Sequence, residues 1–200
     1  MNCLVPDLIQ IVDAALASAA FRSGEHLACR PGCTQCCHGV FAISQQDADR
    51  LRIGLENLTA HDAARAQRIR TRVTESLGRL DANFPGDRTT GILHDDYGED
   101  PDFDNFANDE PCPVLDPATG TCDLYQHRPI LCRTFGPPMR DEDGNFSTCE
   151  LCYTTASTQE IAACELAPAV PDLQAASDEA FNAAHNLSGE TLIAFALRPE

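Results

Sequence analysis

The stretch CRPGCTQCCHGV, residues 29–40, places four cysteines within nine positions, and two of them are adjacent. A disulfide framework, a packed apolar core or a metal centre could each require thiols so close together. The chain has 200 residues, enough to bury about 70% of its unfolded surface, so a core can form without covalent cross-links. Its eleven cysteines are an odd number, which rules out complete intramolecular pairing. The sequence therefore favours cysteines that are retained for their chemistry.

The spacing of the cysteines favours the metal centre. Cys29 and Cys33 form a C-x-x-x-C piece, and Cys149 and Cys152 form a C-x-x-C piece. Such pieces let two thiolates from one turn point at a single ion, which is why they recur in zinc and iron–sulfur sites. Independent core thiols would need no such spacing. The candidate metal ligands are Cys29, Cys33, Cys36, Cys37, Cys112, Cys122, Cys132, Cys149 and Cys152.

The adjacent pair Cys36 and Cys37 bears on the kind of centre. In extended backbone, neighbouring side chains diverge, so two consecutive cysteines do not readily point at one ion. Two metal centres, or one polynuclear cluster with several corners, would accommodate them. Cys29, Cys33 and Cys36 also have the spacing by which radical SAM enzymes hold a 4Fe–4S cluster. Those enzymes set it in a βα barrel, however, and no run of βα units is visible in this sequence.

Charge and apolar patterning indicate the compartment and the partners. The formal net charge is −17, so we expect neither nucleic acid nor an anionic membrane surface as a partner. No stretch approaches the roughly 20 apolar residues of a membrane span. Asp7 and Asp13 interrupt the first apolar residues, which argues against a secretory signal. We expect a cytoplasmic protein, because clustered cysteines in that reducing compartment are more often metal ligands or redox-active than disulfide-bonded.

Helical periodicity accounts for much of the remaining chain. Apolar residues recur at three- and four-residue spacing over 4–19, which predicts an amphipathic helix. Ser44 has the features of an N-cap for a second helix. A third helix fits 61–82, with its arginines mostly on a solvent-facing side. Two more helices are expected over 157–166 and 172–187.

These patterns predict a mainly α fold with irregular cysteine-bearing loops and little β structure. Only the sequence CDLY, residues 122–125, suggests a short strand, and the final TLIAFALRP suggests a strand or packed segment. We expect one small metal-centred domain spanning residues 1–200. Its expected parts are a metal core at about 26–155, an acidic loop at 84–111 and a helical part at 156–200.

The stretch PCPVLDPATGTCDLYQHRPILCRTFG, residues 111–136, taken with CRPGCTQCC, closely resembles the CxxCxxCC family of zinc- or iron-chelating domains. That family has a C-x-x-(x)-C-x-x-C-C cluster, then C-P-x-L, Gly-x-Cys, an aromatic residue, Arg-Pro-x-x-Cys-Arg-x-Phe and a further cysteine. The last cysteine falls on Cys149 or Cys152, and Gln35 stands where members often carry glycine. The other matching positions are Cys29, Cys33, Cys36, Cys37, Cys112, Pro113, Leu115, Cys122, Tyr125, Arg128, Pro129, Cys132, Arg133 and Phe135.

Two classes of function follow. Thiolate ligands select zinc or iron–sulfur over magnesium and calcium, and ligands spread at nine-residue gaps with an adjacent pair favour iron–sulfur. The first class is a metal-binding module, structural or redox-active, that works through a protein or peptide partner. The second is a cluster-dependent enzyme, because a similar cluster occurs in flagellin lysine N-methylases. The chain shows no G-x-G-x-G after a strand, so a Rossmann-type methyltransferase site is not expected.

Arg128 and Arg133 flank Cys132 and are candidate supporting residues. Their guanidinium groups could donate hydrogen bonds to thiolates and offset the charge of a four-thiolate site. Ion pairing with nearby carboxylates is the alternative. Pro129 suits the first position of a short helical turn that would carry Cys132. Cys164, in a helical stretch, is expected to be a core thiol.

Overall fold

A computed structural model describes residues 7–97, 106–141 and 143–199. Residues 4–6 of the expected first helix and residues 98–105 of the expected acidic loop lie outside the described residues. The chain divides into two compact units. Unit 1 comprises Met1–Arg30 and Ile130–Ala180, and unit 2 comprises Pro31–Pro129 and Phe181–Glu200.

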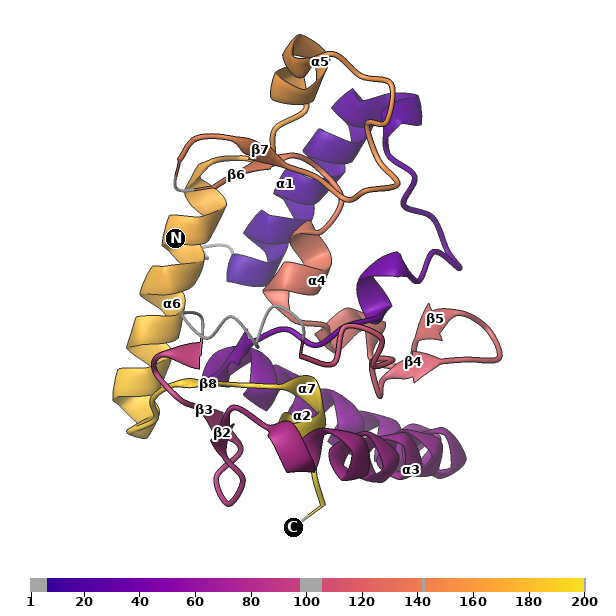
Figure 1. Cartoon of the computed structure of the whole chain (residues 1–200), viewed down its shortest axis with the longest axis vertical. Coiled ribbons are helices and arrows are strands. Elements are labelled where there is room, and N and C mark those ends of the chain that lie inside the picture. The colour runs from indigo at the N-terminus through magenta and orange to yellow at the C-terminus, as the bar shows by residue number, and fades with distance from the viewer. Residues whose placement is uncertain (1–6, 98–105, 142, 200) are drawn as a thin grey trace, which may run out of the picture. The chain divides into compact units, whose positions relative to one another are not determined.

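Unit 2 is built on two long antiparallel neighbours, α2 (Gln45–His61) and α3 (Ala63–Leu80), with the short α7 (Ile193–Ala196) against both (Figure 1). The predicted cap is confirmed, because the Ser44 hydroxyl accepts a hydrogen bond from the Asp47 amide at 3.2 Å. One residue separates the two helices. That residue, Asp62, caps α3 by accepting the Arg65 amide at 2.9 Å.

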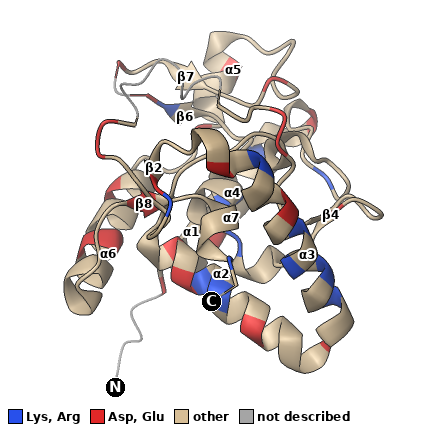
Figure 2. Cartoon of the chain, turned by 60° about the horizontal axis from the view of Figure 1, so that its bottom comes forward, with Lys and Arg blue, Asp and Glu red and all other residues tan. Residues whose placement is uncertain are grey.

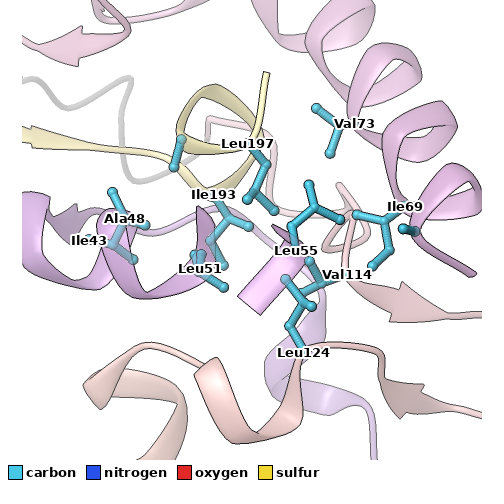
Figure 3. Packing of buried hydrophobic residues seen from close by; sticks show 12 residues of the cluster. Ile43, Ala48, Leu51, Leu55, Ile69, Val73, Val114, Leu124, Ile193 and Leu197 are labelled. Atoms are coloured by element: carbon cyan, nitrogen blue, oxygen red, sulfur yellow. The ribbon is translucent and has the colours of Figure 1, made fainter. Parts of the chain in front are cut away.

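The core of unit 2 lies between these helices and the cysteine segments (Figure 3). Leu51 and Leu55 of α2 are one turn apart, as are Ile69 and Val73 of α3, so each pair shares a face. The other labelled core residues are Ile43, Ala48, Val114, Leu124, Ile193 and Leu197. Since Val114 and Leu124 lie two residues beyond Cys112 and Cys122, burial of this core anchors both cysteine segments.

Every strand among the described residues is two residues long. In unit 2, β8 pairs with both β1 and β3, and β2 completes an antiparallel sheet of order β1-β8-β3-β2. A separate hairpin pairs β4 with β5, and β5 overlaps the strand predicted from CDLY. The bounds are β1 Ile43–Ser44, β2 Gly86–Asp87, β3 Ile92–Leu93, β4 Leu115–Asp116, β5 Thr121–Cys122 and β8 Glu190–Thr191.

Unit 1 packs α1 against α4, with Val12 and Ala19 of α1 buried with Ile130 of α4. Leu166 and Val170 complete this cluster. A third two-stranded sheet pairs β6 with β7. The bounds are α1 Leu8–Ser23, α4 Ile130–Thr134, α5 Thr158–Ala163, α6 Ala169–His185, β6 Met139–Arg140 and β7 Phe146–Ser147; α6 runs on past Ala180 into unit 2.

The predicted fold class is confirmed, because helices supply most of the regular structure and the sheets are small. Short 3-10 turns also occur in the described residues: η1 Gly24–His26, η2 Gln35–Cys37, η3 Asp81–Asn83 and η6 Tyr125–His127. The segment expected as an acidic loop contains the β2–β3 hairpin in its described part. Among the described residues, no helix combines the length and apolarity that a membrane crossing requires.

Candidate metal centre

The candidate ligands are distributed over both units, and no disulfide joins the cysteines that the structure describes. Unit 2 contains Cys33, Cys36, Cys37, Cys112 and Cys122. Unit 1 contains Cys29, Cys132, Cys149 and Cys152, together with Cys164. The geometry within each unit therefore defines a separate set of neighbours.

The adjacent pair lies on the turn η2 rather than on extended backbone. The Cys37 amide donates to the Thr34 carbonyl at 2.8 Å, which tightens the turn. The Cys36 and Cys37 thiols are hydrogen-bonded to each other. The backbone is therefore not extended at this pair, so the reason for expecting the two side chains to diverge does not apply to this turn.

Backbone hydrogen bonds join this turn to the next cysteine segment. The Cys112 amide donates to the Cys37 carbonyl at 2.8 Å. One residue further out on each side, His38 and Pro111 form an isolated antiparallel bridge. The Gly39 amide then donates to the Glu110 carbonyl at 3.0 Å. These backbone hydrogen bonds hold Cys37 and Cys112 side by side although they are 75 positions apart in the sequence.

The β4–β5 hairpin brings in Cys122. Cys122 lies opposite Leu115 in the hairpin, and the Asp123 amide donates to the Val114 carbonyl at 2.7 Å. Three separate segments of sequence thus meet through main-chain hydrogen bonds. We name their four thiols the unit 2 cysteine group: Cys36, Cys37, Cys112 and Cys122.

Electrostatics also link the members of the unit 2 cysteine group. The hydrogen bond from Cys37 lowers the pKa of Cys36, and the same bond, burial and the charges of the other three thiolates raise the pKa of Cys37. Desolvation raises the pKa of Cys112 to about 12 and also raises the pKa of Cys122. Without a cation, these thiols resist becoming thiolates together. A bound metal ion would supply the missing positive charge.

Arg128 is close enough to this group to act on it. Its positive charge lowers the pKa of both Cys36 and Cys122. The guanidinium lies over the Tyr125 ring, 3.8 Å from the ring centroid. Arg133, in unit 1, has a side chain only 2% exposed and donates to both carboxylate oxygens of Asp13, at 2.8 and 2.9 Å. The structure therefore gives Arg128 a thiol environment and gives Arg133 a carboxylate partner.

The arginines of α3 face solvent only in part: Arg68 and Arg79 are exposed, whereas Arg65, Arg70 and Arg72 are half-buried. Figure 2 shows a series of positively charged positions along this helix. Three of the arginines form ion pairs with buried carboxylates that flank Cys112 and Cys122. Sequence reasoning missed these residues because their partners lie in a distant segment.

Unit 1 has its own gathering of cysteines. Cys149, Cys152 and Cys164 are buried in one cluster with Tyr153. The Cys152 amide donates to the Cys149 carbonyl at 2.9 Å, and Tyr153 completes the turn with φ of 57°. The Ala28 amide donates to the Cys152 sulfur at 3.4 Å. Cys164 is a buried core thiol as expected, but no pattern in the sequence indicates that it lies beside the C-x-x-C piece.

The two remaining candidates of unit 1 lie elsewhere in it. Cys132 is on α4, which begins directly after Pro129 as predicted. Cys29 is exposed, and its sulfur packs against Gly136: a Cβ atom at Gly136 would lie 2.7 Å from it. The glycine that follows Phe135 therefore leaves room for the Cys29 thiol.

The donor chemistry suits a thiophilic metal. Four thiols within one unit match the ligand number of a four-thiolate zinc or iron–sulfur site. In the described part of the chain, no three or more His, Cys, Asp or Glu side chains already form an arrangement that could hold a metal ion. Sites that fold with their metal usually bring their ligands together only on binding.

A pocket of about 360 Å³ lies beside Cys122 of the unit 2 cysteine group. It is lined by Cys122, Arg65, Tyr125 and two histidines, His61 and His127, among others. The His127 ring packs so closely on α2 that a Cβ atom at Gly54 would lie 2.6 Å from it. The pocket gives small molecules an approach to Cys122.

The fold and the cysteines define a small, mainly α, thiol-rich domain of the metal-chelating kind. The chain belongs to the CxxCxxCC family, described as a "putative zinc- or iron-chelating domain", which matches residues 28–165. The resemblance found in the sequence is thereby confirmed, and with it the expectation of zinc or iron chelation. No curated protein and no solved structure matches the chain.

Proposed function

We propose that this protein holds an iron–sulfur cluster, with zinc as the alternative, through the thiolates of the unit 2 cysteine group. The observation that supports this most is the meeting of three sequence segments, joined by main-chain hydrogen bonds, at four mutually interacting thiols. The adjacent pair and the wide spacing favour iron–sulfur over zinc, because structural zinc favours paired C-x-x-C pieces.

The other predicted ligands have a place in the same proposal. Cys33 lies in unit 2, four residues before Cys37 and close to the β4–β5 turn, where a Cβ atom at Gly120 would lie 3.5 Å from Thr34. The unit 1 candidates would form a second centre: Cys29, Cys132, Cys149 and Cys152. The proposed role is structural or redox-active, exerted through a protein or peptide partner.

Metal analysis of the intact chain tests the proposal. The protein is purified without oxygen, its visible absorption is recorded, and iron, acid-labile sulfide and zinc are counted per chain. Matched iron and sulfide with visible absorption establish an iron–sulfur cluster. A colourless protein with enough zinc to use four thiolates establishes the zinc alternative. A protein free of both metals overturns the proposal.

The pocket beside Cys122 favours a second candidate, a cluster-dependent enzyme that modifies a peptide or small molecule, for example by lysine N-methylation. An enzyme needs a substrate next to the metal, and His61, Arg65 and His127 offer polar contacts at that position. Adding S-adenosylmethionine and a lysine-containing peptide would then change the visible spectrum of the metal-loaded protein. An unchanged spectrum with both additions favours the closed metal module.

A further inference from the structure

Arginine recurs at regular spacing along α3. Arg65, Arg72 and Arg79 are spaced seven residues apart, close to two helical turns, so their side chains project from one side of the helix. All three reach acceptors in the segments that carry Cys112 and Cys122. We call these three residues the arginine ladder.

The first contact of the arginine ladder, made by Arg79, holds the segment that leads into Cys112. Arg79 donates from Nε and Nη2 to the two carboxylate oxygens of Glu110, both at 2.8 Å. A bidentate pair of this kind fixes direction as well as distance. The Glu110 side chain is 8% exposed, and its backbone carbonyl accepts the Gly39 amide. Glu110 therefore connects α3 to the backbone hydrogen bonds that join Cys37 to Cys112.

The second contact connects both cysteine segments at once. Arg72 donates from Nε to the Pro113 carbonyl at 2.8 Å, and from Nη2 to an Asp123 carboxylate oxygen at 2.5 Å. Pro113 follows Cys112 directly, and Asp123 follows Cys122 directly. A single planar guanidinium thus spans the two loops, a task for which the ammonium group of lysine lacks the geometry.

The third contact gives Asp123 a second arginine partner. Arg65 donates to the other Asp123 carboxylate oxygen, so each oxygen has its own arginine. The Asp123 side chain is 1% exposed. Buried ion pairs contribute little net stability compared with apolar packing, although breaking one is costly. The role that these contacts support is therefore the geometry they impose, more than the stability they add.

We propose that the arginine ladder positions Cys112 and Cys122 for the metal, so that Arg65, Arg72 and Arg79 are positioning residues of the metal centre. The inference rests on the proposed function, since it assumes that these cysteines are ligands. The ladder touches the residues next to the cysteines, which leaves the sulfur atoms available to the metal. Loss of a ladder contact would let one cysteine segment shift against the other.

Metal retention tests the ladder. Full-length wild type, Arg72→Gln, Arg72→Lys and the control Arg68→Gln are purified with their native metal and mixed with an excess of a metal chelator. Arg68 lies on the same helix and forms no ion pair among the described residues. We expect Arg72→Gln to release metal roughly 10- to 100-fold faster than wild type, the usual effect of losing a residue that orients ligands. The visible spectrum of the bound metal should change as well.

The Lys variant separates positioning from charge. If Arg72 only neutralises charge, Arg72→Lys restores retention; if it positions both loops, Arg72→Lys remains close to Arg72→Gln. Arg79→Gln provides a milder variant should Arg72→Gln fail to fold, because the Arg79 side chain is 52% exposed. Equal release from Arg72→Gln, Arg79→Gln and Arg68→Gln would overturn the ladder while leaving the proposed function intact. A wild type that holds no metal would overturn both.

Discussion

At the scale of single residues, the local conformation of the cysteines determines which of them can act together. Cys36 and Cys37 illustrate this, because the 3-10 turn brings together two thiols that extended backbone would separate. Spacing in the sequence could identify the pair as unusual. It could not predict the turn, since Gln35 carries no turn signal as strong as the glycine that family members often have there.

Gly136 provides a residue-scale prediction. Replacement by Ala would place a Cβ atom 2.7 Å from the Cys29 sulfur at a φ of 117°. Gly144 is the matched control, because it also has positive φ, 81°, but nothing lies within 4 Å of its Cβ position. We expect Gly136→Ala to lower the free energy of unfolding by about 1 kcal/mol more than Gly144→Ala does, the cost of overpacking.

Urea unfolding of both variants measures the difference. Equal losses of unfolding free energy in the two variants would contradict the prediction. They would mean that the Cys29 thiol can move away at no cost, so that the space at Gly136 is not needed for it.

At the scale of elements, the helices were the most predictable part of the chain. Ser44, the stripe of α3 and the turn after Pro129 are local signals, and the structure has a helix at each of them. The partners of the α3 arginines were not predictable. Arg72 and Asp123 are 51 residues apart in sequence, and helical periodicity reveals only that a face is polar, not what will pack against it.

The Arg79–Glu110 pair gives stability a defined pH dependence. Burial alone would raise the pKa of Glu110, but the two hydrogen bonds from Arg79 and the positive charge of Arg79 hold that pKa below its usual value of 4.5. A lowered folded-state pKa means that the pair stabilises the protein above the unfolded pKa and loses this contribution as pH falls through the folded pKa. We expect Arg79→Gln to cost about 1 kcal/mol near neutral pH, a modest value because Arg79 is half exposed.

That difference between wild type and Arg79→Gln should shrink as the pH falls below about 4.5 and should be lost once the pH is below the lowered folded-state pKa of Glu110. Urea unfolding across this range measures it, with Arg68→Gln as the control that changes charge alone. A gap that stays constant down to pH 3 would contradict the pairing.

At the scale of the whole molecule, the family match from 28 to 165 runs through both compact units. The sequence could identify the metal chemistry, because cysteine spacing is a direct consequence of coordination. It could not sort the cysteines into the two sets of neighbours that the structure describes, since 75 residues separate Cys37 from Cys112 and only tertiary hydrogen bonds join them. The prediction of one domain over 1–200 stays a prediction.

X-ray absorption at the metal edge of the intact, metal-loaded protein tests the central claim most directly. If the unit 2 cysteine group holds the metal, the first coordination shell consists of sulfur, at about 2.3 Å for zinc. Serine variants of Cys112 and Cys122 would each lose sulfur from that shell or lose the metal. A first shell made of nitrogen and oxygen, or a sulfur shell that neither variant changes, would contradict the claim.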